Sequence, residues 1–405
     1  MPGRRVRRAL VGALVVASVL PTAGPAIAAP PPVRRALPGC DSTNAPAEPV
    51  KATPWPQQRY APSRLEPLAT GAGVTVAVID SGVDKTHPQM RGRVVAGRDY
   101  LDGGNGTRDC QGHGTGVASI IAARQQDGIG FHGLAPDARI MPIRVSEQTI
   151  IEGEQSGRTV TAEQFASAIR WAVDHGADVI NLSVVLYEDN PQVRSAIAHA
   201  LDEDVVVVAA AGNLHENGDP RPYPAAYEGV IGVGAVGQDG TVAGFSQRGD
   251  YVDLVAPGSK VLVAVPERGH KEENGTSYAA PFVAATAALI REYWPDLTAA
   301  EVAARILATT DPAPGNRAHD YGAGILNPYR AVTDTSAPAR RQPAGGLPPE
   351  QIDPAEVARA ERRSVAQERA LWVAGGAGLV AALALLLAVV VPRGSRRRWR
   401  PAGPA

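Results

Sequence analysis

The sequence predicts an α/β fold in which a mainly parallel β-sheet carries helices on both faces. Apolar runs bounded by turn residues alternate with segments of helical periodicity along the middle of the 405-residue chain. Strands that are apolar throughout, with helices between them, are typical of a parallel sheet that is covered on both sides. In such sheets the functional residues lie at the carboxyl ends of the strands, so polar side chains there are the candidates for chemistry.

Apolar runs and helical segments divide the central region as follows. Strands are expected at residues 74–79, 140–145, 179–182, 205–211 and 230–236. Helices are expected at about residues 114–124, 161–175 and 191–202. The polar segment 146–160 between a strand and a helix predicts a loop. Thr298 and Glu301 form a capping box, which predicts the start of a short helix that ends near Thr309.

The segment Asn-Gly-Thr-Ser-Tyr-Ala-Ala-Pro at residues 274–281 predicts a turn that delivers Ser277 to the first residues of a helix. That helix continues to Ile290 with apolar residues on nearly every side, which predicts burial. Pro281 is compatible with a first turn, where amides have no intrahelical partner. A serine there lies beside the positive end of the helix dipole, which favours negative charge. The same residues also suit an ordinary helix cap, so this segment alone leaves both interpretations open.

Asp80 and His113 are the next candidates. Asp80 ends the first apolar run and is followed by Ser-Gly, and His113 lies between two glycines where a helix is expected to start. A nucleophilic serine needs a base to take its proton, and the base needs an acceptor that fixes its tautomer. Taken singly, Asp80 is equally compatible with turn chemistry, and His113 with a loop or cap position.

Asn213 follows Gly212 at the end of a predicted strand. Its amide can donate a hydrogen bond to a developing oxyanion, together with the backbone amide of Ser277. The alternative is a left-handed turn residue. The occurrence of Asp, His, Asn and Ser in this order, each in its own motif, favours the catalytic interpretation. The remaining histidines lack such contexts, and no role is assigned to His87, His132, His175, His199, His215, His270 and His319.

With these four motifs, about residues 70–330 resemble a subtilisin-type serine protease. The resemblance implies a subtilisin-like fold, polypeptide substrates, peptide-bond hydrolysis through an acyl-enzyme, and no cofactor. It also places Ser183, Val184 and Val185 at the substrate pocket. The family usually has glycine where Val185 stands, so we expect a narrower cleft. No spacing of histidine, cysteine or carboxylate residues is typical of a metal site.

The N-terminus predicts export. Residues 1–28 contain arginines, an apolar run and then small residues, the order of a secretory signal peptide, with cleavage expected after Ala28. The pair Arg7–Arg8 supports a twin-arginine signal only weakly. Residues 29–68 form a Pro-rich extension that is expected to be extended and irregular, and residues 69–334 form the catalytic domain.

The C-terminus predicts a membrane anchor. Residues 371–391 are 21 uncharged residues, enough to cross a hydrocarbon core of about 30 Å as a single helix. A buried core helix is the alternative. A linker with a charged helical stretch, 335–370, precedes this span, and a basic tail, 392–405, follows it. Arginine counts on the two sides are nearly equal, so the signal peptide decides the orientation: catalytic domain outside the cell membrane, tail in the cytoplasm.

Charge and cysteine content narrow the function further. A net charge of −1 and a pI near 6.7 argue against a nucleic-acid-binding surface. The two cysteines, Cys40 and Cys110, are expected to form a disulfide in an exported chain. Two free thiols, or bonds to other chains, are the alternatives. Cys110 lies three residues before His113, so the bond would hold the extension against the rim of the catalytic cleft.

The order of parts as a whole resembles the mycosins, the membrane-anchored proteases of type VII secretion systems in actinobacteria. This resemblance implies core components of that secretion system as partners. The extension of about 40 residues is too short for the folded inhibitory prodomain of secreted subtilisins. Two other functions remain open: a structural subunit that stabilises a secretion complex with dispensable proteolysis, and a housekeeping extracellular protease.

Overall fold

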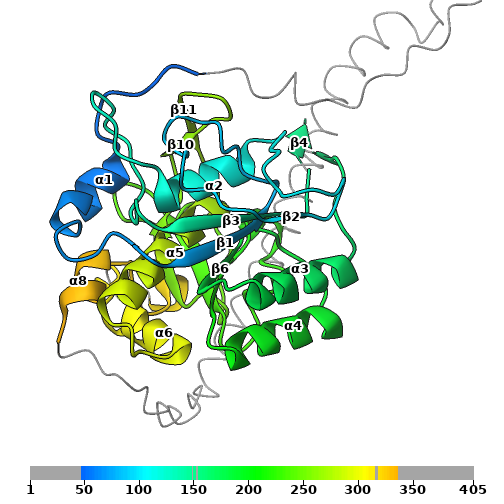
Figure 1. Cartoon of the computed structure of the whole chain (residues 1–405). Helices are drawn as coiled ribbons and strands as arrows, with labels where there is room; N and C mark the ends of the chain where they lie inside the picture. The colour runs from blue at the N-terminus through cyan, green and yellow to red at the C-terminus, as the bar shows by residue number, and fades with distance from the viewer. Residues whose placement is uncertain (1–46, 148, 152–153, 315–317, 336–405) are drawn as a thin grey trace, which may run out of the picture. The chain divides into compact units, whose positions relative to one another are not determined.

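The computed structural model describes residues 47–147, 149–151, 154–314 and 318–335 (Figure 1). All of them belong to one compact unit, Met1–Ala337. The expected signal peptide, Cys40, the linker, the predicted span at 371–391 and the tail lie outside the described residues. Within the described part of the chain, no helix has the length and apolar character needed to cross a membrane.

A seven-stranded sheet in the order β2–β3–β1–β6–β7–β8–β9 forms the centre of this unit (Figure 1). Every pair of neighbouring strands in it is parallel. The strands are β1 Thr75–Asp80, β2 Arg98–Asp99, β3 Arg139–Arg144, β6 Val179–Leu182, β7 Val206–Ala210, β8 Ile231–Val236 and β9 Leu254–Pro257. The predicted parallel α/β fold is confirmed, and the five predicted strands lie within about one residue of observed ones.

Alternate residues of the central strands β3, β1, β6 and β7 face two separate hydrophobic cores. Val76 and Val78 of β1 belong to one core, and Ala77 and Ile79 belong to the other. Successive side chains of a strand point to opposite faces, so a strand covered on both sides must be apolar throughout. This explains the unbroken apolar runs in the sequence.

Helices cover both faces of the sheet. One core contains residues of α2 His113–Ala122, α5 Thr276–Tyr293, α6 Ala299–Ala308 and α8 Pro328–Thr333. The other contains residues of α3 Ala162–Asp174 and α4 Pro191–Asp202, which lie side by side (Figure 1). A one-turn helix, α7, spans Ala318–Tyr321. The capping box predicted at Thr298 is present, and a second one at Thr161 starts α3.

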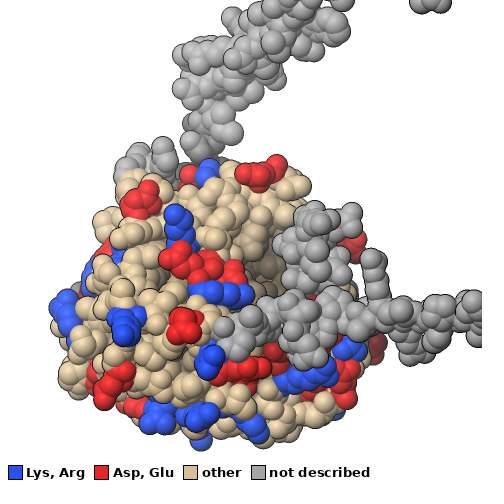
Figure 2. Space-filling view, turned by 90° about the horizontal axis from the view of Figure 1, so that it is seen from above, with Lys and Arg blue, Asp and Glu red and all other residues tan. Residues whose placement is uncertain are grey.

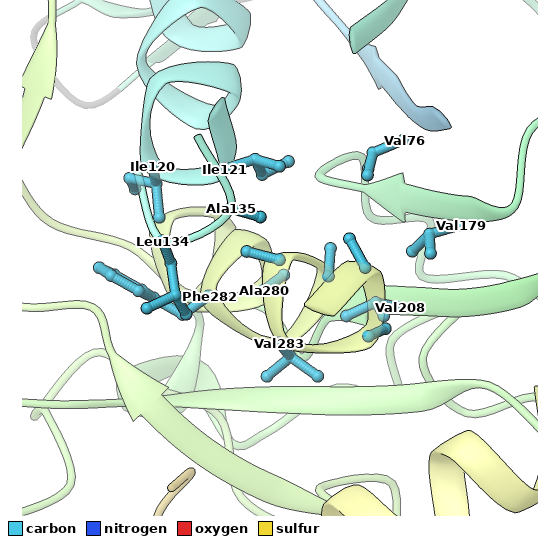
Figure 3. Packing of buried hydrophobic residues seen from close by; sticks show 14 of the residues in the cluster. Val76, Ile120, Ile121, Leu134, Ala135, Val179, Val208, Ala280, Phe282 and Val283 are labelled. Carbon is cyan, nitrogen blue, oxygen red and sulfur yellow. The ribbon is translucent and has the colours of Figure 1, made fainter. Parts of the chain in front are cut away.

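Helix α5 lies in the middle of its core and packs against both α2 and the sheet. Its residues from Thr276 to Ile290 are all buried. Figure 3 shows Ala280 and Val283 of this helix near Ile121 of α2 and Val208 of β7. The predicted burial of this segment is therefore confirmed.

The placement of Pro281 in the first turn is wrong, because α5 begins at Thr276 and Pro281 lies inside the helix. Proline has no N–H, so the carbonyl of Ser277, four residues earlier, loses its helical partner. Ser183 Oγ lies 3.5 Å from this carbonyl oxygen and donates to it instead. The proline thus frees a backbone acceptor at the start of the helix, and a side chain of the neighbouring strand end satisfies it.

Several strands were not predicted, among them β2 and β9 of the main sheet. Segment 146–160, expected to be a loop, contains the antiparallel pair β4 Thr149–Ile151 and β5 Glu154–Ser156. A second antiparallel pair joins β10 Val261–Ala264 to β11 His270–Glu273. Because β2, β5 and β11 are polar, none of them carries the apolar signal that revealed the five predicted strands.

The expectation of an irregular extension is wrong for its last part. Helix α1 spans Trp55–Tyr60, and a 3-10 turn spans Pro62–Arg64. Tyr60 is buried, and its ring packs edge-on against Phe282 of α5 at a centroid distance of 5.6 Å. A helix this short is marginal by itself, so contact with the core stabilises it, and no periodicity reveals it.

His270 attaches the extension to the catalytic domain. The amide of Val50 donates to His270 Nδ1 at 3.1 Å, and His270 Nε2 lies 2.6 Å from Gln89 Oε1. This pattern requires a neutral ring that carries its proton on Nε2. Burial, assisted by nearby His87, lowers the pKa of His270 to about 4.

We expect acid to weaken this attachment. In the folded protein His270 stays neutral down to about pH 4, whereas in the unfolded chain it takes up a proton near 6.5. A depressed folded-state pKa contributes stability that is present above pH 6.5 and lost as the pH falls towards 4. Between about pH 7 and about pH 4.5 the loss is on the order of 2–3 kcal/mol. Urea unfolding at both pH values should show a larger loss for the wild type than for His270→Gln.

The matched control is His199→Gln, which changes a partly exposed histidine on α4. This variant should lose as much stability on acidification as the wild type does. If His270→Gln also loses as much as the wild type, the buried histidine is not the acid-sensitive group.

Candidate active site

Asp80, His113 and Ser277 come together at the carboxyl edge of the sheet. Asp80 is the last residue of β1, His113 is the first residue of α2, and Ser277 follows the first residue of α5. His113 Nδ1 lies 2.7 Å from Asp80 Oδ1, and His113 Nε2 lies 2.9 Å from Ser277 Oγ. This chain of contacts gives the hydroxyl a base and gives the base an acceptor.

The structure also separates these residues from their alternative roles. The N-cap of α5 is Gly275 and the N-cap of α2 is Gly112, so neither Ser277 nor His113 caps its helix. Gly212, with φ +94°, takes the left-handed position in the turn before Asn213. Asp80 does accept a hydrogen bond from the Ser81 amide at 2.6 Å, so it serves its local turn as well as His113.

Asp109, which the sequence analysis missed, holds the loop that carries His113. Its buried carboxylate accepts hydrogen bonds of 2.6–3.2 Å from Ser81 Oγ, from two loop amides, and from the amide and hydroxyl of Thr115. Burial raises the pKa of Asp109 to about 6, against the hydrogen bonds of Thr115 and Ser81, which act to lower it. An acidic residue just before a glycine-capped helix is the signal that could have revealed it.

The surroundings of His113 favour its protonated form. Burial acts to lower its pKa, but the charge and hydrogen bond of Asp80, together with other nearby carboxylates, outweigh burial, so the pKa of His113 is raised above 6.5. The more distant charges of Asp109 and Glu273 act in the same direction. The imidazolium that forms when His113 accepts a proton is therefore stabilised where it is needed.

Thr276 fixes the orientation of Asn213, and this residue was also missed. Asn213 Oδ1 accepts from the Thr276 amide at 2.9 Å and from Thr276 Oγ1 at 3.0 Å. The Nδ2 group of Asn213 is thereby left to face the space beside Gly275. A Cβ atom on Gly275 would come within 2.9 Å of Ser277 Oγ and 3.5 Å of Asn213 Nδ2. Glycine therefore keeps the space between nucleophile and amide open.

A cleft of about 270 Å³ lies beside these groups. It is lined by Asp80, Ser81, His113, Ser146, Ser183, Val184, Val185, Tyr187, Gly212, Asn213 and Leu214. The three residues that the resemblance placed at the substrate pocket are thus part of its wall. Tyr187 and Leu214 were not predicted. A second hollow of about 370 Å³ shares Val184, Val185 and Tyr187 with the first, so these three residues border both.

Two further features of this region are the state of Cys110 and the capacity to bind a metal ion. Cys110 is buried and is not a free thiol. Cys40 lies outside the described residues, so the pairing of the two cysteines stays a prediction. Among the side chains that the structure describes, no group of three or more histidine, cysteine or carboxylate residues is arranged to hold a metal ion.

The profile of the Subtilase family matches residues 71–324. This chain belongs to the subtilase family. It is 36% identical to Thermitase of Thermoactinomyces vulgaris over 278 residues, which are 68% of this chain and 94% of the relative. Its serine peptidase activity follows from this membership, and the resemblance to a subtilisin-type protease is confirmed.

The similarity to mycosins is also confirmed, and it extends beyond the catalytic domain. The chain is 34% identical to Mycosin-1 of Mycobacterium tuberculosis (strain ATCC 25618 / H37Rv) in an alignment of 415 positions that covers 84% of this chain and 91% of the relative. The crystal structure of MycP1 from the ESX-1 type VII secretion system superposes with a TM-score of 0.64 at 29% identity. That match covers 74% of this chain and 92% of MycP1.

We expect kcat/KM for peptide hydrolysis to rise with pH through an apparent pKa above 6.5. His113 must be neutral to accept the proton of Ser277, and Asp80 raises the pKa of this ring. Asp109→Asn removes one of the charges that raise it, so the apparent pKa should fall. A pH–rate profile measures both, with the exposed turn variant Asp239→Asn as control. A wild-type value below 6.5 would show that Asp80 does not raise the pKa of His113 as expected.

Proposed function

We propose that this subtilase is a membrane-anchored serine endopeptidase that acts outside the cytoplasmic membrane, as a mycosin-type component of type VII secretion. Asp80, His113 and Ser277 are its catalytic triad. The observation that carries the proposal is the pair of hydrogen bonds at 2.7 and 2.9 Å that links the three side chains beside an open cleft. The similarity to Mycosin-1 supports the secretion role.

In the first step Ser277 Oγ attacks the scissile carbonyl carbon while His113 Nε2 takes its proton. Asp80 stabilises the imidazolium that results. The carbonyl oxygen becomes an oxyanion, and Asn213 Nδ2 and the Ser277 amide donate hydrogen bonds to it. His113 then gives the proton to the leaving amine. Water hydrolyses the acyl-enzyme by the same route and restores Ser277.

The wall formed by Ser183, Val184 and Val185 binds the substrate chain in this proposal. A β-branched Val185 narrows the cleft, so small residues should be preferred just before the scissile bond. Charged residues of both signs are interspersed over the face shown in Figure 2, so no single-sign surface there selects a strongly acidic or basic protein.

Anchoring and attachment of the extension are proposed from the sequence. Residues 371–391 form the membrane span, with the basic tail in the cytoplasm. A Cys40–Cys110 disulfide closes a long loop and stabilises the folded protein by roughly 4 kcal/mol in the chain-entropy estimate. With the His270 contact, this bond makes the extension a permanent part of the domain.

We expect Ser277→Ala to remove labelling by a fluorophosphonate probe together with peptide hydrolysis, while the protein stays folded. Asn213→Ala should reduce kcat by roughly 10²–10³, the cost of losing one oxyanion donor. Ser195→Ala, which changes an exposed serine on α4, is the control and should label normally. Normal hydrolysis by purified Ser277→Ala protein would exclude the triad.

The same variant separates proteolysis from a structural role. A strain that carries Ser277→Ala and still secretes normally would indicate that the protein stabilises a secretion complex and that its proteolysis is dispensable. Loss of secretion with normal protein levels would instead indicate that hydrolysis is required.

Truncation after about residue 336 should release a soluble, folded catalytic domain, because it removes the predicted span and leaves all described residues in place. Cell fractionation measures this. The full-length chain should stay with the membrane fraction after a high-salt wash, and the truncated chain should not. If the truncated, signal-bearing chain remains membrane-bound, residues 371–391 are not the anchor.

A further inference from the structure

We infer that Tyr187 and Gln247 form a bridge across the substrate cleft, and that Gln247 is a positioning residue that holds the oxyanion donor Asn213 in place. The inference rests on the proposed function. It adds two residues that the triad chemistry does not use and that no sequence motif indicated.

Gln247 forms hydrogen bonds to the turn on both sides of Asn213. Its side chain is buried, and its Oε1 accepts a hydrogen bond from the Leu214 amide at 3.2 Å. Its backbone amide donates to the Gly212 carbonyl at 3.0 Å. The residue before Asn213 and the residue after it are thus both bonded to the same glutamine.

The side chain of Gln247 is itself fixed. Its Nε2 donates to the Pro220 carbonyl at 2.5 Å, which determines which end of the carboxamide faces the turn. A Cβ atom at Gly212 would come within 2.1 Å of Gln247 Oε1, so glycine is required for this close approach. The glycine before Asn213 therefore serves the contact with Gln247 as well as the left-handed backbone.

Tyr187 joins this arrangement to the opposite wall. Its hydroxyl donates to Gln247 Oε1 at 3.1 Å, and it follows the wall segment 183–185 by two residues. The neighbouring Leu186 is fixed by paired backbone hydrogen bonds of 2.7 and 2.8 Å with Tyr223. The wall and the Asn213 turn thus share one acceptor atom, Gln247 Oε1.

The exposure of Tyr187 argues against a purely structural role. Its side chain is 40% exposed and lines the cleft rather than a core. A hydrogen bond at such a position contributes little to folding stability. An oxyanion donor, in contrast, must be held in place before charge develops, so a small displacement of Asn213 is costly to the reaction.

The Tyr187–Gln247 bridge also links the size of the substrate side chain to kcat. A small substrate side chain between the wall and the turn leaves the Tyr187–Gln247 bond intact. A bulky one must displace Tyr187, which loosens the support of Asn213. Larger residues before the scissile bond should therefore reduce kcat in addition to weakening binding.

A double-mutant cycle on the full-length protein tests this. Gln247→Leu keeps the approximate size of the side chain and removes the hydrogen bonds of its carboxamide, while the backbone bond to the Gly212 carbonyl remains. It should lower kcat about tenfold and leave KM within about twofold, since it acts on the transition state. In an Asn213→Ala background the same change should cause no further loss, because its target is gone. An equal loss in both backgrounds would show that Gln247 acts independently of Asn213, and would overturn the inference.

Tyr187→Phe is the second variant, and it removes only the hydroxyl of a partly exposed side chain. We expect kcat to fall about threefold in the wild-type background and not at all with Asn213→Ala. Tyr293→Phe is the matched control, since Tyr293 is 39% exposed at the end of α5, and it should have wild-type kinetics. If Gln247→Leu does not fold, Tyr187→Phe alone tests the inference. Kinetics equal to those of Tyr293→Phe would then overturn the bridge.

The outcomes distinguish this inference from the proposed function. If Ser277→Ala abolishes hydrolysis while Gln247→Leu and Tyr187→Phe are unchanged in kcat, the triad stands and only the bridge is wrong. If Ser277→Ala retains hydrolysis, both are wrong, because Asn213 then has no oxyanion to stabilise.

Discussion

The burial of helix α5 is the constraint on which the rest of the structure depends. Every residue from Thr276 to Ile290 is buried, so the sheet and the surrounding helices must enclose this segment on all sides. Ser277 therefore stands in the first turn of a packed element, where its position is set by the core. Asp80 and His113 end β1 and begin α2, and both elements contribute to the same core as α5. The three side chains meet because their elements pack together.

The first turns of α5, which carry Ser277, depart from the usual patterns of helix hydrogen bonding and capping. Pro281 removes a helical hydrogen bond from the Ser277 carbonyl, and Gly275 replaces the usual side-chain cap. Each departure has a use: Ser183 from the substrate wall bonds to the freed carbonyl, and the missing Cβ leaves space between Ser277 Oγ and Asn213 Nδ2. Local rules are expected to fail at functional sites when the surrounding fold supports the exception.

Helices and strands could be predicted from the sequence where a continuous local pattern of residues encodes them. Five of the seven strands of the main sheet were predicted closely, and so were α3 and α4, because burial on both faces or helical periodicity leaves a continuous signal. Strands β2 and β9 were missed. Helix α1 was missed because its stability depends on Tyr60 packing against Phe282, far along the chain. The residues that orient the site were missed for a related reason. Thr276 and Asn213, for example, are 63 positions apart, and no local pattern encodes their hydrogen bonds.

Orientation of Asn213 requires two independent supports, because a carboxamide can rotate and a turn can shift. Thr276 controls rotation, since both of its donors bond to Asn213 Oδ1 and so leave Nδ2 facing the space beside Gly275. Gln247 controls position, since it bonds to the residues on either side. A hydrogen-bond donor that must reorganise during the reaction contributes less than one that is already in place. Thr276 belongs to the helix that carries the nucleophile, and Gln247 contacts the substrate wall through Tyr187. In the proposed mechanism, the position of the oxyanion donor Asn213 is thus tied both to the helix that carries Ser277 and to the wall that borders the substrate cleft.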